Sequence, residues 1–348
     1  MKLGLVLGYW GSVPDTGLAL AREAEALGYH SVWVAEAYGT DAFTPLAWIG
    51  AHTSRIGLGT AIAQIPARTP AMTAMTVSTL DMLSGGRVLL GLGVSGPQVV
   101  EGWHGVAYGK PLARTREYIA IVRDMLKRDG PTRFQGEFYR LPYDGPDATG
   151  LGRPLKLIQH PVRARVPIYL GAMGPKNVAL AAEIADGWFP HMLSPLHVDD
   201  IYRPQLEEGF ARAGGGKRFE DFEIVAQVYV TVGDDLDACR RAEKKRLALI
   251  LGGYGARSRN FYVNTVARYG YSKVLDQIQD LYLAGRKDDA ERAIPDELVD
   301  ELTVVGPRAH VKMQLDRWRR AGIRMFAAWT DQPQALRLLA ELEREAGG

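Results

Sequence analysis

Residues 166–190 read VPIYLGAMGPKNVALAAEIADGWFP and contain the repeating unit that decides the fold. An apolar run at 166–173 leads through a Gly-Pro turn into an alanine-rich helical segment at 175–185, and a second apolar run follows at 187–192. Near-continuous apolar runs of this length are typical of parallel strands that are buried on both faces. The stretch therefore predicts two parallel strands joined by a helix.

The same alternation extends along the whole chain. Six further apolar runs predict strands at 2–9, 31–38, 55–63, 87–94, 223–232 and 324–330. Segments with helical periodicity separate them at 15–28, 70–83, 112–129, 199–213, 235–251 and 307–321. This pattern predicts a (β/α)8 TIM barrel, because a doubly wound sheet usually has fewer strands. We expect one domain over residues 1–348, with loops and helices inserted at the strand carboxyl ends at about 95–111, 130–165 and 252–306.

Composition narrows the class of protein. With 47% hydrophobic residues, 24% charged residues and a net charge of +2, the chain can bury a large core and has no overall field that would attract nucleic acid. The single cysteine, Cys239, cannot form an internal disulfide, which is compatible with a cytoplasmic location. We find no signal-peptide pattern and no apolar run long enough to cross a membrane.

Barrel enzymes place their active sites at the carboxyl ends of the strands, so the residues that follow each run are the candidates. Glu36 follows the second run, where a carboxylate could transfer a proton or accept hydrogen bonds from nearby backbone amides. Aromatic and histidine side chains are candidates for a substrate pocket: Tyr9, Trp10, Tyr38, Trp103, His104, Trp188 and His191. The histidine spacing matches no metal-binding motif, so no metal site is predicted.

The turn GAMGPKN (171–177) is the most specific feature of the sequence. Pro175 has a backbone angle suited to the first position of a helix, and Gly174 would let another group approach the backbone. The amides of Lys176, Asn177 and Val178 would then point outward and bind a phosphate. In the alternative interpretation, this is an ordinary helix start whose glycines only relieve crowding.

A second glycine-rich turn, GLGVSGPQ (91–98), ends the fourth predicted strand. Two such strand ends side by side are what a barrel uses to bind phosphate, and Ser95 and Gly96 would line the same cavity. The chain also lacks a Gly-x-Ser-x-Gly nucleophile pattern. A phosphate cradle with apolar walls and no evident nucleophile or metal indicates that a cofactor supplies the chemistry.

Several longer motifs carry a family resemblance. The segments TLDMLSGGRVLLGLGVSG (79–96) and GPKNVALAAEIADGW (174–188), together with WVAEAYGTDAFTPLAWIG and KPLARTREYI, resemble the luciferase-like flavin and deazaflavin oxidoreductases. The resemblance is to their coenzyme F420-dependent branch and spans nearly the whole chain. It implies a (β/α)8 barrel, usually a homodimer, that binds its cofactor at the strand ends and moves a hydride to or from a small organic substrate.

The resemblance also implies site residues. Thr60, Ala61, Ile62 and Gln64 would lie against the cofactor ring, with a non-proline cis peptide between Ala61 and Ile62 and with Glu36 nearby. The phosphate site and its surroundings would comprise Gly93, Val94, Ser95, Gly96, Gly171, Ala172, Met173, Gly174, Pro175, Lys176 and Asn177. Arg68 or Lys110 could meet the anionic tail of the cofactor.

The chain departs from the family pattern at two positions. Sugar-phosphate dehydrogenases of the family have a histidine after the acid of strand two and a glutamate after the glycines of strand four, where this chain has Ala37 and Pro97. That substrate is therefore not carried over. Two alternatives remain: an FMN-dependent monooxygenase on the same scaffold, and a flavin- or deazaflavin-binding protein without catalysis. In the enzyme, the segments 130–165 and 252–306 would cover the substrate.

Overall fold

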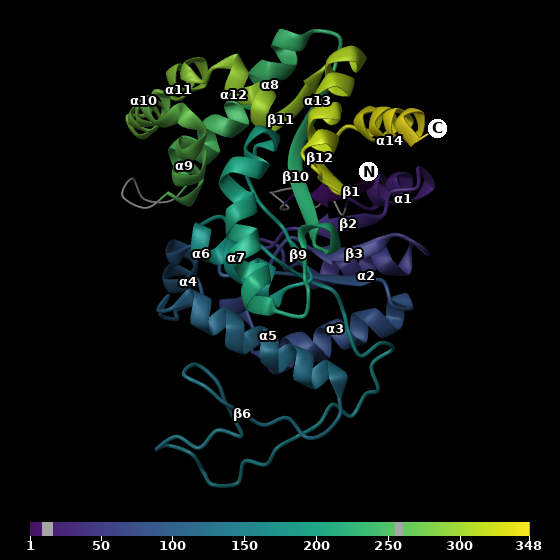
Figure 1. The fold of residues 1–348 in the computed structure, drawn as a ribbon, viewed down its shortest axis with the longest axis vertical. Coiled ribbons are helices and arrows are strands. Elements are labelled where there is room, and N and C mark those ends of the chain that lie inside the picture. The colour runs from purple at the N-terminus through teal and green to yellow at the C-terminus, as the bar shows by residue number, and fades with distance from the viewer. Residues whose placement is uncertain (9–16, 255–259, 348) are drawn as a thin grey trace.

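The architecture is a closed barrel of parallel strands with helices around it (Figure 1). The computed structural model describes residues 1–8, 17–254 and 260–347. The barrel strands are β1 (Lys2–Leu7), β2 (Ser31–Val34), β3 (Gly57–Thr60), β5 (Val88–Gly93), β8 (Ile168–Leu170), β9 (Gly187–Trp188), β10 (Glu223–Val232) and β12 (Met325–Trp329). The barrel closes because β9 pairs with β10, β10 with β12 and β12 with β1. Each strand lies within a predicted run, which confirms the TIM barrel.

Helices follow the strands in the order that the sequence predicts. They are α1 (Leu18–Ala26), α2 (Phe43–Ala51), α3 (Pro70–Ser84), α4 (Pro97–Gly102), α5 (Pro111–Lys127), α6 (Pro175–Ile184), α7 (Arg203–Ala213), α8 (Leu236–Ala248), α13 (Arg308–Arg320) and α14 (Pro333–Gly347). Short turns of other helix types are η1 (Ile65–Ala67), η2 (Pro195–His197), η3 (Val198–Tyr202) and η4 (Phe219–Asp221). Helices α2 and α14 were not predicted; α2 reads FTPLAWIGA and has no polar stripe that would give it a helical period.

One large side chain fills much of the barrel interior. Trp33 of β2 is fully buried, and its ring centre lies 4.9 Å from that of Phe189 and 5.3 Å from that of Tyr169. Its indole N–H donates to the hydroxyl of Ser31 at 2.8 Å. A Cβ at Gly59 would lie 2.2 Å from the indole ring, so the neighbouring strand has to leave this space empty. The interior is therefore a packed core, as expected for this fold.

The segment LSGGR (83–87) joins α3 to β5, and its contacts hold the turn between them. Gly85 and Gly86 adopt φ angles of 69° and 88°, which end the helix in the left-handed region that favours glycine. Asp81 accepts hydrogen bonds from the amide of Val88 at 3.0 Å and from the guanidinium of Arg163 at 2.7 Å. Arg87 donates to the carbonyl oxygens of Gly50 and Ile56 at 2.8 and 3.0 Å. These contacts fix the start of β5.

Residues 130–165, which we call the arm, contain the predicted hairpin, formed by β6 (Phe134–Gln135) and β7 (Arg140–Leu141). The contacts that hold the arm among the described residues are with the helices α5 and α3. Glu117 in the middle of α5 accepts the amide of Phe138 at 2.9 Å, and Gln159 donates to the carbonyl of Ser78 in α3 at 3.1 Å. The arm joins the end of α5 to the start of β8, so it runs along the outside of the helices (Figure 1).

The insertion at 252–306 is a group of short helices at the end of the molecule opposite the arm (Figure 1). It contains η5 (Leu249–Gly253), α9 (Phe261–Val266), η6 (Ala267–Tyr271), α10 (Ser272–Leu283), α11 (Lys287–Ala293) and α12 (Asp296–Leu302). It ends in a strand that was not predicted, β11 (Thr303–Gly306), which pairs with the carboxyl-terminal half of β10. A strand of this length, directly after a helix, leaves too short an apolar run to be recognised.

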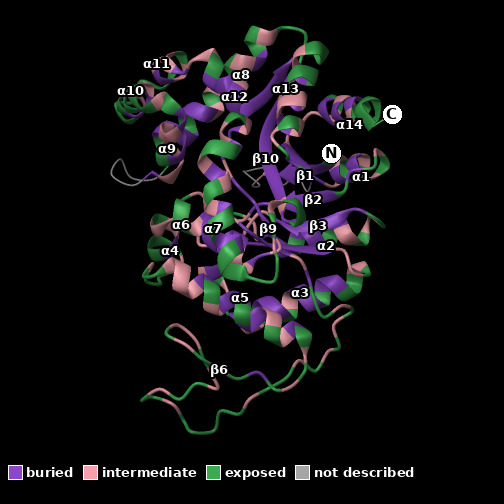
Figure 2. Cartoon of the chain, in the orientation of Figure 1, coloured by how far each residue is buried: buried purple, intermediate pink, exposed green. Residues whose placement is uncertain are grey.

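Burial follows the layers of the barrel (Figure 2). The strands are buried, and the arm is mostly intermediate or exposed. The remaining strand, β4 (Ala63–Gln64), is buried beside β5 at the carboxyl end of the barrel. Within the described ranges, no helix has both the length and the apolar character needed to cross a membrane.

Substitutions at two glycines test how closely the strands approach one another. A Cβ at Gly91 would lie 1.9 Å from the carbonyl oxygen of Thr60, whereas a Cβ at Gly102 would meet nothing within 4 Å. We expect Gly91→Ala to lower the free energy of unfolding in urea by about 3 kcal/mol or more. Gly102→Ala, the matched control, should change it by less than about 0.5 kcal/mol. Equal stability of the two variants would contradict this account of the β3–β5 contact.

Candidate functional site

The end of β3 carries the most unusual backbone of the site. The peptide bond between Ala61 and Ile62 is cis, which confirms the expectation from the resemblance. The bulge is held on one side by Thr60, whose hydroxyl donates to the carbonyl of Gly91 at 2.6 Å. Ala61 packs against the same interior cluster that contains Trp33. The bulge therefore closes the top of the barrel interior.

The side chain of Ile62 extends across the ends of the next two strands. A Cβ at Gly93 would lie 2.7 Å from the Ile62 Cδ1 atom, and a Cβ at Gly171 would lie 3.1 Å from Cγ2. The glycines at these two strand ends therefore make room for Ile62. In the alternative interpretation, the glycines of the GAMGPKN turn only relieve crowding. That interpretation explains Gly171, because a larger residue there would crowd Ile62.

Glu36 anchors the bulge from the second strand. One carboxylate oxygen accepts the backbone amide of Gln64 at 2.8 Å, and Arg68 donates to both oxygens at 2.7 Å. The Glu36 side chain is 6% exposed, so the contact with Arg68 is a nearly buried ion pair. Of the two roles that the sequence allows, these contacts match the backbone acceptor. Arg68 is held at this carboxylate instead of extending toward solvent.

Three of the predicted pocket residues gather beside Gln64. The amide group of Gln64 donates to the carbonyl of Ala37 at 2.6 Å, and its side-chain oxygen lies 3.4 Å from Nε2 of His104. Tyr38 and Trp103 are exposed, and their ring centres are 6.4 Å apart. The structure thus brings Tyr38, Trp103 and His104 together on one side of the strand ends. Lys110, the other candidate for the cofactor tail, forms an exposed ion pair with Glu137.

The turn after β5 has a second special conformation. Ser95 has a φ of 59°, in the left-handed region that serine rarely adopts. The following residue, Gly96, caps the short helix α4, and its carbonyl accepts the amides of Val99 and Val100 at 3.1 and 3.0 Å. Val94, Ser95 and Gly96 remain partly exposed at the strand end. Residues held in sparsely populated backbone regions gather at functional sites, which fits the predicted role of this turn.

The start of α6 is exposed and open. Gly174, Pro175 and Lys176 are exposed, and a Cβ at Gly174 would meet nothing within 4 Å. Neither crowding nor a positive φ therefore requires glycine at position 174, where φ is −75°. One expectation was wrong: the amides of Asn177 and Val178 do not point freely outward, because both donate to the carbonyl of Gly174 at 2.9 Å. The amide and the side chain of Lys176 remain as donors.

Two further side chains support this turn. Trp188 is fully buried, donates its indole N–H to the carbonyl of Ala172 at 2.8 Å and packs against Tyr202 with ring centres 5.0 Å apart. It therefore braces the turn from inside and does not line an open pocket. Arg268, from the insertion, donates to the carbonyl of Met173 at 3.5 Å. This second cation beside the turn was not predicted, because the sequence does not show where η6 lies.

His191 lies in a group of aromatic rings that the sequence did not bring together. Its ring centre is 6.0 Å from that of Tyr229, 5.1 Å from that of Tyr262 and 6.5 Å from that of Trp329. Burial lowers the pKa of His191 to about 4, so the imidazole is neutral at pH 7. Tyr9 and Trp10, the remaining pocket candidates, lie outside the described residues.

Comparison with known families shows which family the chain belongs to. The family model described as luciferase-like monooxygenase matches residues 7–325. The chain belongs to the luciferase-like family. A relative from Mycobacterium tuberculosis, whose name describes it as a coenzyme F420-dependent oxidoreductase, is 52% identical over 343 residues, which cover 98% of this chain and 99% of the relative.

Two solved structures share the fold. The coenzyme F420-dependent tetrahydromethanopterin reductase from Methanopyrus kandleri superposes with a TM-score of 0.79 at 23% identity, covering 98% of this chain and 97% of that chain. An F420-dependent secondary alcohol dehydrogenase, solved with an F420–acetone adduct, gives a TM-score of 0.74 at 21% identity with the same coverage. At these identities the comparison supports the architecture alone.

The anchor of the bulge in this luciferase-like chain can be tested with a double-mutant cycle. Arg68→Met leaves the nearly buried Glu36 carboxylate without its cation, so we expect the free energy of unfolding to fall by about 3 kcal/mol. Combining Arg68→Met with Glu36→Gln should cost at least about 1 kcal/mol less than the sum of the two single losses.

An exposed ion pair provides the control for this cycle. Lys127 and Asp129 are both more than half exposed, so Lys127→Met should leave the free energy of unfolding nearly unchanged. Urea denaturation of all variants measures these differences. Strict additivity of the Glu36 and Arg68 substitutions would show that the pair does not act as a unit.

Proposed function

We propose that this protein is a coenzyme F420-dependent oxidoreductase that transfers a hydride between the deazaflavin and a small organic substrate. The observation that carries the proposal is the position of Ile62, which lies across the strand ends that lead into the open start of α6. An apolar surface beside a site for an anion suits a cofactor with a flat ring and a phosphate. The Mycobacterium tuberculosis relative supports F420 as that cofactor through its name.

The residues of the site fit such a group. The ring would lie against Thr60, Ala61, Ile62 and Gln64, and the open space at Gly174 would admit the phosphate beside Ser95, Gly96 and Lys176. Asn177 remains a candidate through its side chain, since its amide is already bonded within the turn. The bound deazaflavin would supply the carbon that gives or takes the hydride. The chain would orient the ring and fix the phosphate.

Glu36 is proposed to position the ring surface. To transfer a proton, its carboxylate would have to release Arg68 and the amide of Gln64, both of which it holds at hydrogen-bond distance. Loss of those contacts would free the bulge that carries the ring site. Its contacts therefore support a positioning role over the catalytic role first considered.

Titration separates the F420 enzyme from the FMN-dependent alternative. The purified chain is titrated with F420 and with FMN, and binding is followed by cofactor fluorescence. We expect F420 to bind at least about tenfold more tightly, a difference of about 1.4 kcal/mol. Tight FMN binding without F420 binding would overturn the proposal. Single-turnover oxidation of bound reduced F420 with a ketone, an enone and an imine separates an enzyme from a non-catalytic binding protein, which would give no oxidation.

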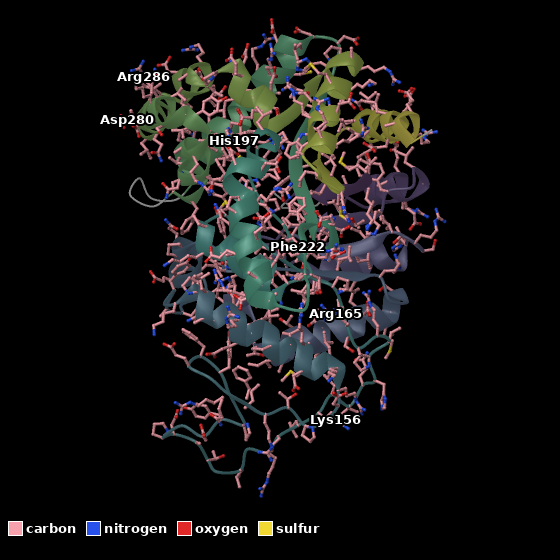
Figure 3. The ribbon with its side chains drawn as sticks, in the orientation of Figure 1. Lys156, Arg165, His197, Phe222, Asp280 and Arg286 are labelled. Carbon is pink, nitrogen blue, oxygen red and sulfur yellow. The ribbon has the colours of Figure 1, made fainter. Side chains whose placement is uncertain are left out.

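The phosphate site can be tested by reversing one charge. Lys176→Glu should weaken F420 binding at least about tenfold, because it places an anion at the positive end of the helix. Binding of the phosphate-free deazaflavin should change by less than about twofold. Lys156→Glu, on the arm far from this turn (Figure 3), is the matched control. Equal loss for both deazaflavins would contradict a phosphate contact.

The homodimer belongs to the same proposal. Apolar side chains of α3 and the arm are exposed beside each other: Met75, Met82, Leu83, Ile158 and Val162. Gln159 holds the arm against α3 through its bond to Ser78 at 3.1 Å. Contiguous apolar patches of this kind mark interaction surfaces in soluble proteins. We place the contact between two copies of the chain at this patch.

Charged substitutions in the patch should separate the copies. The double variant Leu83→Glu/Ile158→Glu would bury two unpaired carboxylates in the contact, so we expect a monomer by light scattering after size exclusion. Leu283→Glu, at an exposed leucine of α10, should leave the dimer intact. A wild-type monomer, or a dimer that survives the double variant, would contradict the placement.

A further inference from the structure

The proposed reaction requires a group that exchanges a proton with the substrate. The two positions that carry a histidine and a glutamate in the sugar-phosphate dehydrogenases of the family cannot provide it in this chain. Ala37 and Pro97 have no side chain that can transfer a proton. The Glu36 carboxylate is occupied by Arg68 and the amide of Gln64. The proton therefore has to come from another side chain near the strand ends, such as His104 or His191.

His191 follows β9, in a segment whose backbone is clamped. Tyr269 donates its hydroxyl to the carbonyl of Met192 at 2.9 Å, and Met192 has a left-handed φ of 58°. The amide of Ser194 in turn donates to the Tyr269 hydroxyl oxygen at 3.4 Å. The position of the imidazole is therefore fixed by the insertion as well as by the barrel.

Two partners of His191 come from β10, which pairs with β9, and from β12, the next strand around the barrel. Tyr229 and Trp329 are register partners across β10 and β12, so their side chains leave the sheet on the same face, and their ring centres are 4.9 Å apart. The hydroxyl of Tyr229 lies 3.4 Å from Nε2 of His191. Trp329 packs on the same interior cluster as Ala61 of the bulge. The ring surface and the histidine thus border the same end of the barrel interior.

Tyr262 of α9 completes the enclosure. Its ring centre lies 5.1 Å from that of His191 and 5.8 Å from that of Tyr254. Burial, and to a lesser extent the nearby Tyr38, raise the pKa of Tyr254. His191 as a residue nevertheless keeps part of its surface exposed.

Charged groups lie behind Tyr229. The guanidinium carbon of Arg246 is 4.5 Å from the centre of the Tyr229 ring, and its Nε atom is 3.3 Å from a carboxylate oxygen of Glu243. Glu243 is fully buried and accepts the hydroxyl of Thr231 at 2.5 Å. Within the described residues, no carboxylate forms an ion pair with His191. Among the described residues, the groups that face the imidazole are therefore neutral rings, with one cation behind the phenol.

We propose that His191, positioned by Tyr229, exchanges the proton that accompanies hydride transfer, and that the substrate is an uncharged carbonyl compound or the corresponding alcohol. The inference rests on the proposed function. Neutral, aromatic surroundings favour a flat, apolar substrate whose single oxygen hydrogen-bonds to the imidazole. The described residues around the imidazole offer a charged substrate no counter-ion.

Reduction of the carbonyl compound moves one hydride and one proton to the substrate. The carbonyl carbon gains the hydride, the π electron pair of the C=O bond moves to oxygen, and that oxygen takes the proton of the imidazole N–H. The imidazole nitrogen facing Tyr229 takes the phenol proton, and water reprotonates the phenolate. Arg246 beside the ring stabilises the negative charge while it persists. Oxidation of the alcohol moves the same protons in reverse.

The first test uses the cofactor-free protein, so that it does not depend on the proposed function. Histidine signals are followed by NMR while acetophenone or cyclohexanone is added. We expect the His191 signals to shift and those of the exposed His160 to stay unchanged, and Tyr229→Phe to alter the nitrogen shifts of His191. If neither ketone moves the His191 signals, the inference is wrong even if F420 binds. A ketone shift without F420 binding would instead overturn the proposed function.

The second test uses the protein loaded with reduced F420. We expect His191→Gln to lower kcat for ketone reduction by about a hundredfold or more while F420 affinity stays within about twofold. Tyr229→Phe should alter the dependence of kcat on pH, and His160→Gln should behave as the wild type. A loss of kcat in His104→Gln with a normal His191→Gln variant would assign the proton to the other side of the site and overturn the inference.

Discussion

The buried contact between Glu36 and the segment after β3 is the constraint on which the site depends. The carboxylate accepts the amide of Gln64 at 2.8 Å and binds Arg68, so one acid at the end of β2 fixes the chain that follows β3. A carboxylate this far from water is stable only when charged and hydrogen-bonding partners surround it. Because Ala61 and Ile62 lie within the segment that it fixes, the same contact positions the cis peptide.

Side-chain packing inside the barrel shapes the site together with the Glu36 contact. Trp33 occupies the space that Gly59 leaves, and Ile62 crosses the ends of two strands where Gly93 and Gly171 leave room. Small residues on one strand therefore face large residues on the next, as close packing requires. This packing produces a closely packed apolar surface at the carboxyl ends of the strands, with the open turn at Gly174 beside it.

Much of the fold could be predicted because it depends on local pattern. The eight strands lie within the apolar runs, and the hairpin of the arm and the start of α6 appear where turn residues indicate them. Helix α2 and strand β11 could not be predicted, since one lacks a polar face and the other is too short. The path of the arm also escaped prediction, because a sequence does not show which face of a helix an inserted segment follows.

Sequence alone determined that this chain is a barrel with glycine-rich turns at its strand ends, because alternating apolar and helical periods and turn chemistry are local properties. Its longer motifs added the resemblance to the luciferase-like family. Only the tertiary structure decided which side chains meet. It placed Trp188 inside the core, bound Glu36 to Arg68 and surrounded His191 with Tyr229, Tyr262 and Trp329. Those contacts join residues far apart in the chain, and their geometry follows from strand register and barrel closure, which no local pattern records.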